Sequence, residues 1–341
     1  MPFAPERRAS QSGFTIVELM IAMVLGMIVI GSAVALFVNQ RSTSRLASQM
    51  SDIQNEGRIA IDALARDLRA AGDFGCSLAE PPINTLVTTT AFDSSAGGVR
   101  GYDKGASMTT PPAGQAAASA ANPASDIIAL TGINGVLTTL AAATTSSTAD
   151  LKVALNTPAP KSGDVAIITD CINLSKFQVT GYSTDSDGNG VVAHAITSAS
   201  GTLGGGNSKN DLGALYPAGA TVATLDTRWW FVGQPTNKPK GLYRVDASSG
   251  AKILISPKIA DMRVRYEVDS DGDGIADLFG QTASQVSNWK NVTAVSVELL
   301  ARSDQNVQNV TTSYVFGGQT VTAPDRAAYL PLRLNLGLRN R

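Results

Sequence analysis

The sequence has few of the residues that perform catalysis. Among its 341 residues there are one histidine and two cysteines, and charged residues make up only 16%. A hydrolase needs a nucleophile beside a base, or a metal ion with an open coordination position. The lone histidine and the two distant cysteines exclude most such arrangements, and no glycine-rich stretch has the Walker or dinucleotide-binding pattern. We therefore expect a protein that is not an enzyme.

The net charge is also small. The formal charge is −1 at pH 7, and no basic run is interleaved with aromatic residues. Because a nucleic-acid surface needs clustered Lys and Arg, we expect no direct nucleic-acid contact. Gly, Ala, Ser and Thr are plentiful instead, which is typical of a β-rich, loop-rich protein outside the cytoplasm.

The strongest feature present is an uncharged, mostly aliphatic run from Leu19 to Val38. As a helix it measures about 30 Å, enough to cross the hydrocarbon core of a bilayer. Arg7 and Arg8 precede the run and favour a cytoplasmic N-terminus, although Arg41 and Arg45 follow it. The run predicts a single membrane span.

A carboxylate at the head of this run needs an explanation. Glu18 would cost about 2.5–3.5 kcal/mol near the centre of a membrane helix, and somewhat less near its end. Two ordinary interpretations leave it unexplained. One is a secretory signal with its apolar region at residues 19–30, cut after the sequence AVA at residues 33–35. The other is a plain anchor that keeps its leader.

The stretch SGFTIVELMIAM, residues 12–23, resembles the processing site of type IV prepilins. The resemblance implies that a membrane-embedded prepilin peptidase cleaves between Gly13 and Phe14 on the cytoplasmic side, and that Phe14 is then N-methylated. It also implies a use for Glu18, whose carboxylate accepts the Phe14 ammonium group of a neighbouring subunit during docking. A carboxylate buried in a bundle of apolar helices needs such a cationic partner.

The helical pattern continues beyond the apolar run. Apolar residues recur at steps of three and four, as on one face of an amphipathic helix. They are Leu46, Met50, Ile53, Gly57, Ile61, Leu64 and Leu68. Charged residues, Asp67 among them, are expected on the other faces, and Gly72 and Gly75 are expected to end the helix.

After residue 72 the pattern changes to strands. Four segments have strand patterns, at residues 163–170, 261–269, 291–302 and 330–341. Residues 228–246 predict a hairpin. Two low-complexity tracts, residues 109–126 and 198–210, predict surface loops.

These patterns predict an α+β fold, in which a long N-terminal helix packs on a β-rich extracytoplasmic head with irregular loops. The chain divides into a cleaved leader at residues 1–13, a transmembrane and filament-core helix at 14–38, its amphipathic second half at 39–72, and the head at 73–341.

Several segments resemble one family of minor pilins, PilW. They are RDLRAAGDFGC (66–76), GDVAIITDC (163–171) with Phe177 after it, GLYR (241–244) and LRN (338–340). The resemblance implies an assembly subunit that joins other minor pilins and the major pilin in a pilus-tip complex, which primes pilus growth and carries an adhesin. Twitching motility, adhesion and DNA uptake are the roles of this family. It further implies an inner-membrane protein with its head in the periplasm, later part of the pilus.

Two alternatives stay open on the sequence. One is a minor pseudopilin of a type II secretion system, which shares the N-terminal chemistry and which genomic neighbours would distinguish. The other is a membrane-anchored, calcium-dependent adhesin that never enters a filament. Glu18→Ala should leave that adhesin intact but impair a pilin.

Cys76 and Cys171 are too far apart in the sequence for a CxxC redox or zinc site. They are either two separate buried thiols or, in an exported domain, a disulfide. A bridge that closes a loop of this length would stabilise the fold by roughly 4 kcal/mol on the chain-entropy model.

The acidic stretch DSDGDGIAD, residues 269–277, predicts a structural calcium site. The expected ligands are Asp269, Asp271, Asp273 and Asp277, with the backbone carbonyl of Ile275. Gly280 stands where an EF-hand has its bidentate glutamate, so another residue or water must complete the shell. The alternative is a hairpin turn whose Asp side chains cap backbone N–H groups.

A weaker calcium candidate opens in the same way at Asp185, Asp187 and Asn189. Ala193 stands at its ninth position, where a ligand is needed. His194 follows this loop, and we do not expect it to be a ligand.

Overall fold

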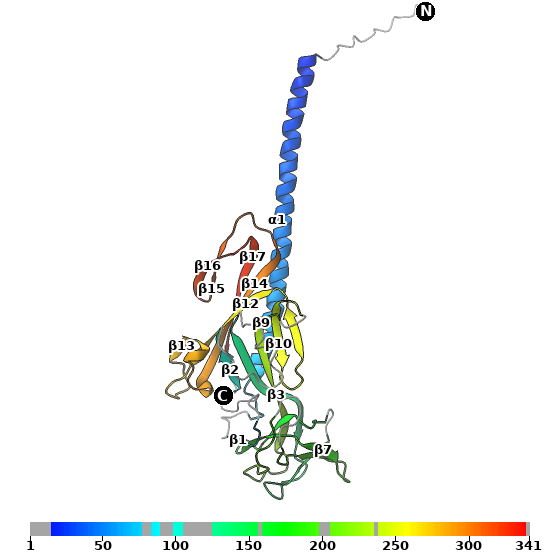
Figure 1. Cartoon of the computed structure of the whole chain (residues 1–341), viewed down its shortest axis with the longest axis vertical. Helices are drawn as coiled ribbons and strands as arrows, with labels where there is room; N and C mark the ends of the chain where they lie inside the picture. Colours follow the sequence, from blue (N-terminus) through cyan, green and yellow to red (C-terminus); the bar gives the residue numbers. More distant parts are fainter. Residues whose placement is uncertain are drawn as a thin grey trace, which may run out of the picture.

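The structure, a computed structural model, describes residues 15–76, 83–88, 98–104, 125–155, 159–197, 205–234 and 238–338. A long helix projects from a β-rich head, with the apolar half of the helix free of the head (Figure 1). The fold is α+β, as the sequence predicts.

Helix α1 spans Ile16–Ala70, which is 55 residues and about 80 Å. Thr15 is its N-cap, and its C-cap Ala71 is followed by Gly72 with φ 75°. This left-handed glycine ends the helix where the sequence predicts.

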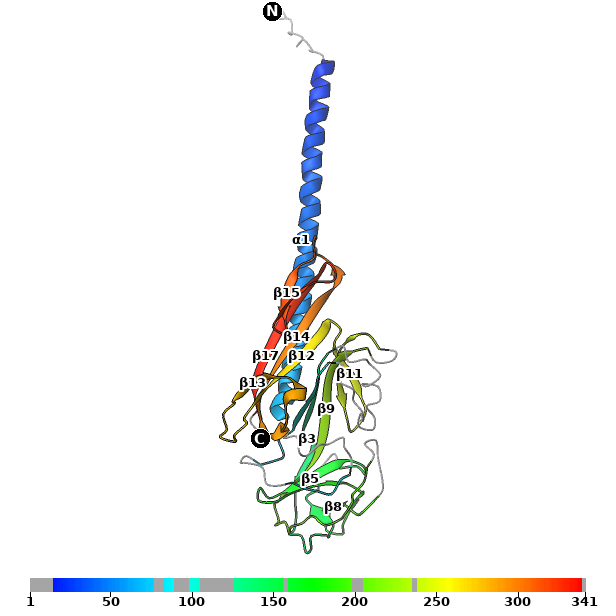
Figure 2. The same cartoon turned by 60° about the vertical axis from the view of Figure 1, so that its left-hand side comes forward.

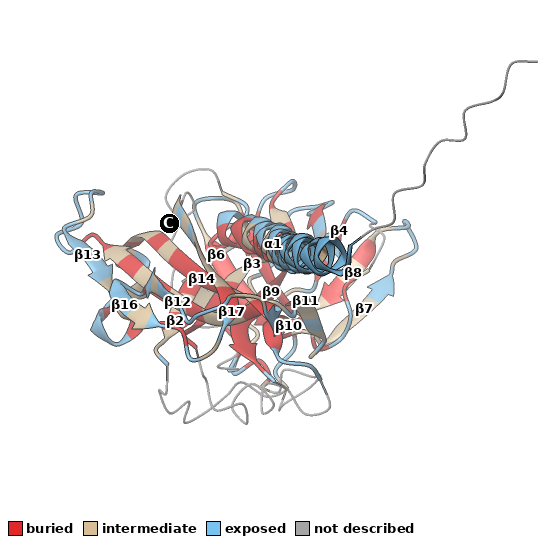
Figure 3. Ribbon diagram, turned by 90° about the horizontal axis from the view of Figure 1, so that it is seen from above, coloured by how far each residue is buried: buried red, intermediate tan, exposed pale blue. Residues whose placement is uncertain are grey.

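Only the second half of α1 packs against the head. The buried residues of the helix are Ile53, Gly57, Ala60, Leu64, Ala65, Asp67 and Leu68. Leu46, Met50 and Ile61 are partly buried on the same core, so the predicted apolar face is confirmed. Figure 3, which looks nearly along α1, shows its near half exposed.

The largest sheet has eight strands built around the long strand β9. Its main path is β1 (Ile83–Thr85), β6 (Leu174–Gln178), β5 (Val165–Thr169), β9 (Thr221–Gly233), β10 (Gly241–Asp246) and β11 (Lys252–Ser256). Strand β3 (Ile127–Thr139) pairs with the other edge of β9, and β2 (Val99–Tyr102) pairs with β3. The β1–β6 pair is parallel. The predicted β9–β10 hairpin is confirmed.

A second sheet, of four antiparallel strands, also packs against the helix. It runs β13 (Leu278–Gln281), β12 (Ile259–Val268), β14 (Val292–Asn306) and β17 (Ala327–Gly337). Smaller elements are the hairpin β15 (Ser313–Phe316) and β16 (Gln319–Thr322), the sheet β4 (Leu151–Val153), β8 (Gly190–Ala193) and β7 (Gly181–Thr184), and two 3-10 turns, η2 (Ala283–Gln285) and η3 (Trp289–Asn291).

The main core lies between α1, the four-stranded sheet and one face of the eight-stranded sheet. Trp230 is part of this core, whereas its neighbour Trp229 lies in a second core on the opposite face of β9. Both indoles are therefore buried, because adjacent residues of a strand face opposite ways.

A third core belongs to the end of the head that is farthest from the bare helix, where β4, β7 and β8 lie. We call this end the distal lobe. Figures 1 and 2 show it at the opposite end of the molecule from the N-terminus.

One helix residue departs from the expected pattern. Asp67, predicted on a polar face, is only 7% exposed. Its Oδ1 accepts a hydrogen bond from Arg228 Nη1 at 2.9 Å, and its Oδ2 accepts one from Trp230 Nε1 at 3.0 Å. Arg244 Nη1 lies 3.9 Å from Oδ2. Asp67 stands three residues after Leu64 and so shares the buried face, which makes the polar-face prediction wrong for this residue.

The charge of Asp67 is costly where it lies. Burial raises the pKa of this carboxyl above its ordinary value of 3.8, and Arg228 and Arg244 oppose the rise. A group with a raised folded-state pKa contributes its full stability below the unfolded-state pKa. That contribution is lost as the pH rises through the folded-state pKa.

We expect Asp67→Asn to lower the free energy of unfolding by about 1–3 kcal/mol at neutral pH, because an amide NH2 would face the donors of Arg228 or Trp230. The difference from wild type should grow as the pH falls toward 3.8. Denaturant unfolding of the full chain in detergent at several pH values measures both effects.

The matched control is Asp62→Asn, on an exposed face of the same helix. It should change the free energy of unfolding by less than about 0.5 kcal/mol. An Asp67→Asn difference that widens with rising pH would contradict the assignment.

Candidate functional site

The apolar half of α1 is bare. Large apolar side chains between Ile16 and Val38 are 55% to 81% exposed. Within the described residues, α1 is the one helix long and apolar enough to cross a membrane, and none of its most apolar stretch is buried in the protein. Such a surface is stable only when lipid or other apolar helices cover it.

Glu18 lies in the first turn of this bare segment. Its backbone N–H donates to Oγ1 of the N-cap Thr15 at 3.3 Å. Thr15 to Glu18 has the sequence pattern of a capping box, and a carboxylate near a helix N-terminus is favoured by the helix dipole. This local contact was not predicted from the sequence. Gly13 and Phe14 lie outside the described residues, so their cleavage and docking stay predictions.

A disulfide joins Cys76 to Cys171, whose Cα atoms are 5.5 Å apart. The predicted bridge is confirmed, and it ties the segment after α1 to the turn between β5 and β6. Cys171 has φ 66° in that turn. Oδ1 of Asp170 accepts N–H bonds from Ile172 at 2.9 Å and from Asn173 at 2.6 Å. Burial raises the pKa of Asp170, but these bonds outweigh it, so the pKa is lowered overall.

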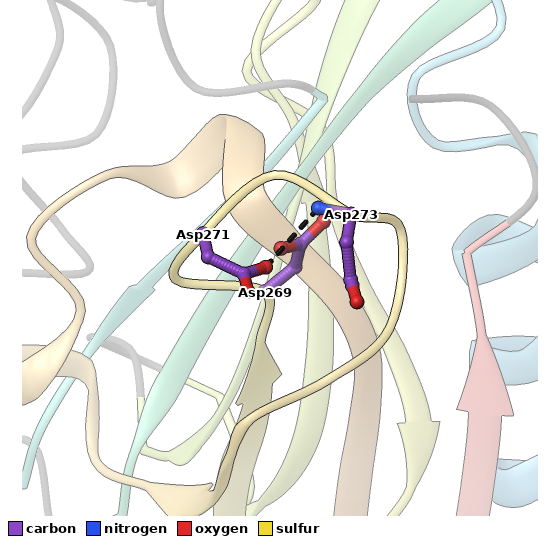
Figure 4. A group of neighbouring side chains, drawn as sticks. All are labelled: Asp269, Asp271 and Asp273. Carbon is purple, nitrogen blue, oxygen red and sulfur yellow. Dashed lines mark hydrogen bonds between the residues drawn. The ribbon is translucent and has the colours of Figure 1, made fainter.

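The first acidic loop, between β12 and β13, brings three of its predicted ligands together. Carboxylate oxygens of Asp269, Asp271 and Asp273 lie within 4.8 Å of one another (Figure 4). Asp269 is 5% exposed and accepts N–H bonds from Gly272 at 2.6 Å and Gly274 at 2.9 Å. The donors are hard oxygen atoms, which suits Ca²⁺, although three residues supply only part of its shell of six to eight ligands.

Asp277 does not join this group. Its Oδ2 accepts bonds from the backbone N–H and the hydroxyl of Ser270, each at 2.8 Å, and these bonds lower its pKa. The Ile275 N–H donates to Asp273 Oδ1 at 2.7 Å, and the Ile275 side chain is exposed. The loop therefore has three clustered carboxylates where the sequence predicted four.

The second acidic loop is the turn between β7 and β8. Asp185 accepts N–H bonds from Asp187 and Asn189 and pairs with the Lys152 ammonium group at 3.3 Å. A side-chain cation thus balances this carboxylate. Within the described residues, the three-carboxylate group at Asp269 is the one acidic cluster close enough to hold a metal ion. His194 is buried, with Nε2 3.0 Å from the Ala149 carbonyl.

Two comparisons bear on the family. Residues 230–340 match the family of type IV pilus-assembly protein W, PilW, and residues 8–34 match the prokaryotic N-terminal methylation motif. No curated protein and no solved structure matches the chain.

The bare apolar helix and the methylation motif define a membrane-anchored, prepilin-like protein. The PilW match over the last third of the chain narrows this class. Together the two matches support a minor type IV pilin of the PilW family, a structural protein involved in pilus assembly.

The disulfide gives a direct stability prediction. Cys76→Ser with Cys171→Ser should lower the free energy of unfolding by about 4.7 kcal/mol on the chain-entropy model, because the bridge closes a loop of 95 residues. Denaturant unfolding is compared for wild type and variant, each with and without reductant. Reductant should destabilise the wild type and leave the variant unchanged, and equal stability of all four samples would contradict the role of the bridge.

Proposed function

We propose that the chain is a pilus-assembly subunit matured by cleavage between Gly13 and Phe14 and by methylation of Phe14. The mature protein is anchored in the inner membrane with its head in the periplasm, and it then enters the pilus. The observation that carries this proposal is the bare apolar helix with Glu18 in its first turn, within the match to the methylation motif at residues 8–34.

Glu18 is the docking group of this proposal. In a filament core the apolar faces of neighbouring helices replace lipid, and a carboxylate there needs a cation beside it. The new ammonium group of a neighbour's Phe14 supplies that charge at the same depth. The capping-box pattern of Thr15 and Glu18 offers a second role for this side chain, which is to accept a hydrogen bond at the start of its own helix. That role needs a hydrogen-bond acceptor but no charge.

The partners follow from the same helix. We propose that the protein meets the prepilin peptidase first, and then other minor pilins and the major pilin, in a tip complex that primes growth and displays an adhesin. Motility, adhesion and DNA uptake would depend on it through the pilus. The PilW match favours this function over a secretion pseudopilin.

Glu18→Ala and Glu18→Gln separate the two roles of this side chain. Glutamine keeps the capping box but loses the charge. We expect both variants to be processed and membrane-bound, and both to enter sheared pili at least about tenfold less than wild type, because a buried ion pair is lost. Immunoblots of membrane and pilus fractions measure this.

Wild-type incorporation of Glu18→Gln, with a defect in Glu18→Ala alone, would assign the residue to helix capping. A calcium-dependent adhesin outside the filament would keep its binding in both variants.

We also propose that Asp269, Asp271 and Asp273 hold a structural Ca²⁺, with waters completing the shell. Bound Ca²⁺ would offset two of the three negative charges of these crowded carboxylates and stiffen the β12–β13 loop, with no role in catalysis. The proposal is supported by the 4.8 Å grouping of their oxygens.

Calorimetric titration of the full chain in detergent tests the calcium site. We expect a Kd of about 10⁻⁴ M, as in extracellular modules. Calcium at about a hundred times Kd should then add roughly 2.7 kcal/mol of stability. Asp271→Asn with Asp273→Asn should abolish both effects, and Asp187→Asn should abolish neither. Absence of binding heat and of stabilisation in the wild type would refute the site.

A further inference from the structure

A cavity of about 390 Å³ lies where the bare helix meets the head. One wall is α1, with Val38, Arg41 and Arg45. The other wall is the end of β14 and the loop after it, residues 305–309, together with Arg326 just before β17. We call this cavity the juxtamembrane pocket. Figures 1 and 2 show these ends of β14 and β17 at the edge of the head nearest the bare helix.

The two walls of the pocket are held in place by the backbone. The Arg326 carbonyl accepts N–H bonds from Val307 and Gln308, each at 3.0 Å. The helix wall is rigid because α1 continues through it without a break. The pocket is thus built from fixed elements of both the helix and the head.

The pocket carries uncompensated positive charge. Within the described residues, Arg41, Arg45 and Arg326 form no ion pair, and no acidic residue lines the cavity. The acidic residues next to the head wall in the sequence already form ion pairs with other side chains. Asp304 binds Lys258, and Asp325 binds Arg302 at 2.6 Å. Three guanidinium groups therefore face one cavity without a counter-ion.

The depth of the pocket matches the lipid headgroups. The apolar run ends at Val38, and Arg41 and Arg45 follow about 4.5 Å and 10 Å further along the axis. Headgroups occupy roughly the next 5–7 Å beyond the hydrocarbon core. Arg41 lies within this zone, its guanidinium 5.0 Å from the Phe37 ring, and long Arg side chains reach along the helix to it.

The lining also suits an amphipathic ligand. Val38 gives the pocket an apolar side that continues into the bare helix, where acyl chains would lie. Gln308 lines the pocket, and its buried Oε1 has no donor within the described residues. A glycerol hydroxyl would supply one. An acidic segment of another protein would match the arginines but would leave the apolar side unused.

We propose that the juxtamembrane pocket binds the headgroup phosphate of an anionic phospholipid of the phosphatidylglycerol class while the chain is anchored in the membrane. The inference rests on the proposal that residues 14–38 span the bilayer. The bound headgroup neutralises the three arginines and holds the head at a fixed height on the membrane surface before docking.

Native mass spectrometry of the full chain in neutral detergent tests this inference. The protein is offered equal amounts of phosphatidylglycerol and phosphatidylcholine with identical acyl chains. We expect a preference of at least about tenfold for phosphatidylglycerol, because each arginine contributes roughly fivefold toward anionic lipid. Inorganic phosphate at the same concentration should neither bind nor displace the lipid.

Arg41→Gln, Arg45→Gln and Arg326→Gln together should abolish the preference, and Arg326→Gln alone should weaken it about fivefold. The control carries Arg58→Gln, Arg66→Gln and Lys161→Gln, which remove the same charge at exposed positions outside the pocket and should keep the preference. All variants should unfold at the wild-type temperature.

Equal binding of both lipids, displacement by inorganic phosphate, or an equal loss in the control would overturn the inference. Membrane fractionation of the same cells separates this failure from that of the pilin proposal. A chain that stays in the membrane without a lipid preference refutes only the pocket, whereas a chain absent from the membrane refutes the anchor as well.

Discussion

The burial of the second half of α1 in the head is the constraint on which the rest of the structure depends. The helix is one wall of the main core. The end of the helix can approach β3 closely because Gly132 has no Cβ, and a Cβ there would overlap the Ala70 carbonyl. Asp67 then fixes the rotation and height of the helix through Arg228 and Trp230. Since α1 is continuous, these contacts also decide where its bare half leaves the head and which side chains stand at the membrane surface.

The PilW match covers only part of the head that packs against the helix. The match begins at residue 230 and covers β10 to β17, which include the four-stranded sheet that holds the helix. The distal lobe is formed by residues outside the match, and the disulfide joins it to the segment that follows α1. The match therefore includes the four-stranded sheet that packs on α1 but leaves out β3 and Arg228, which also hold the helix, and the residues of the distal lobe.

Periodicity predicted the elements well because each of them buries one face. The stripe from Ile53 to Leu68 and the alternation along β12 and β14 both follow from that rule. Buried charges were not predictable in this way. In the sequence Asp67 resembles a surface residue, because its partner Arg228 lies on β9, far along the chain. The Asp126 carboxylate accepts hydrogen bonds from the backbone N–H groups of Lys104 and Val264, each at 2.9 Å, and both residues are distant from it in the sequence. The acidic loop was predicted by spacing, but the hydroxyl of Ser270 that draws Asp277 away depends on the folded turn.

The identity of the N-terminal residue tests the central claim most directly. The protein would be recovered from membranes of cells with and without the prepilin peptidase, and its first residue sequenced. The account predicts a methylated Phe14 that depends on the peptidase, which would give Glu18 the ammonium partner it needs. A chain that starts after Ala35, or that keeps residues 1–13 in the presence of the peptidase, would contradict it.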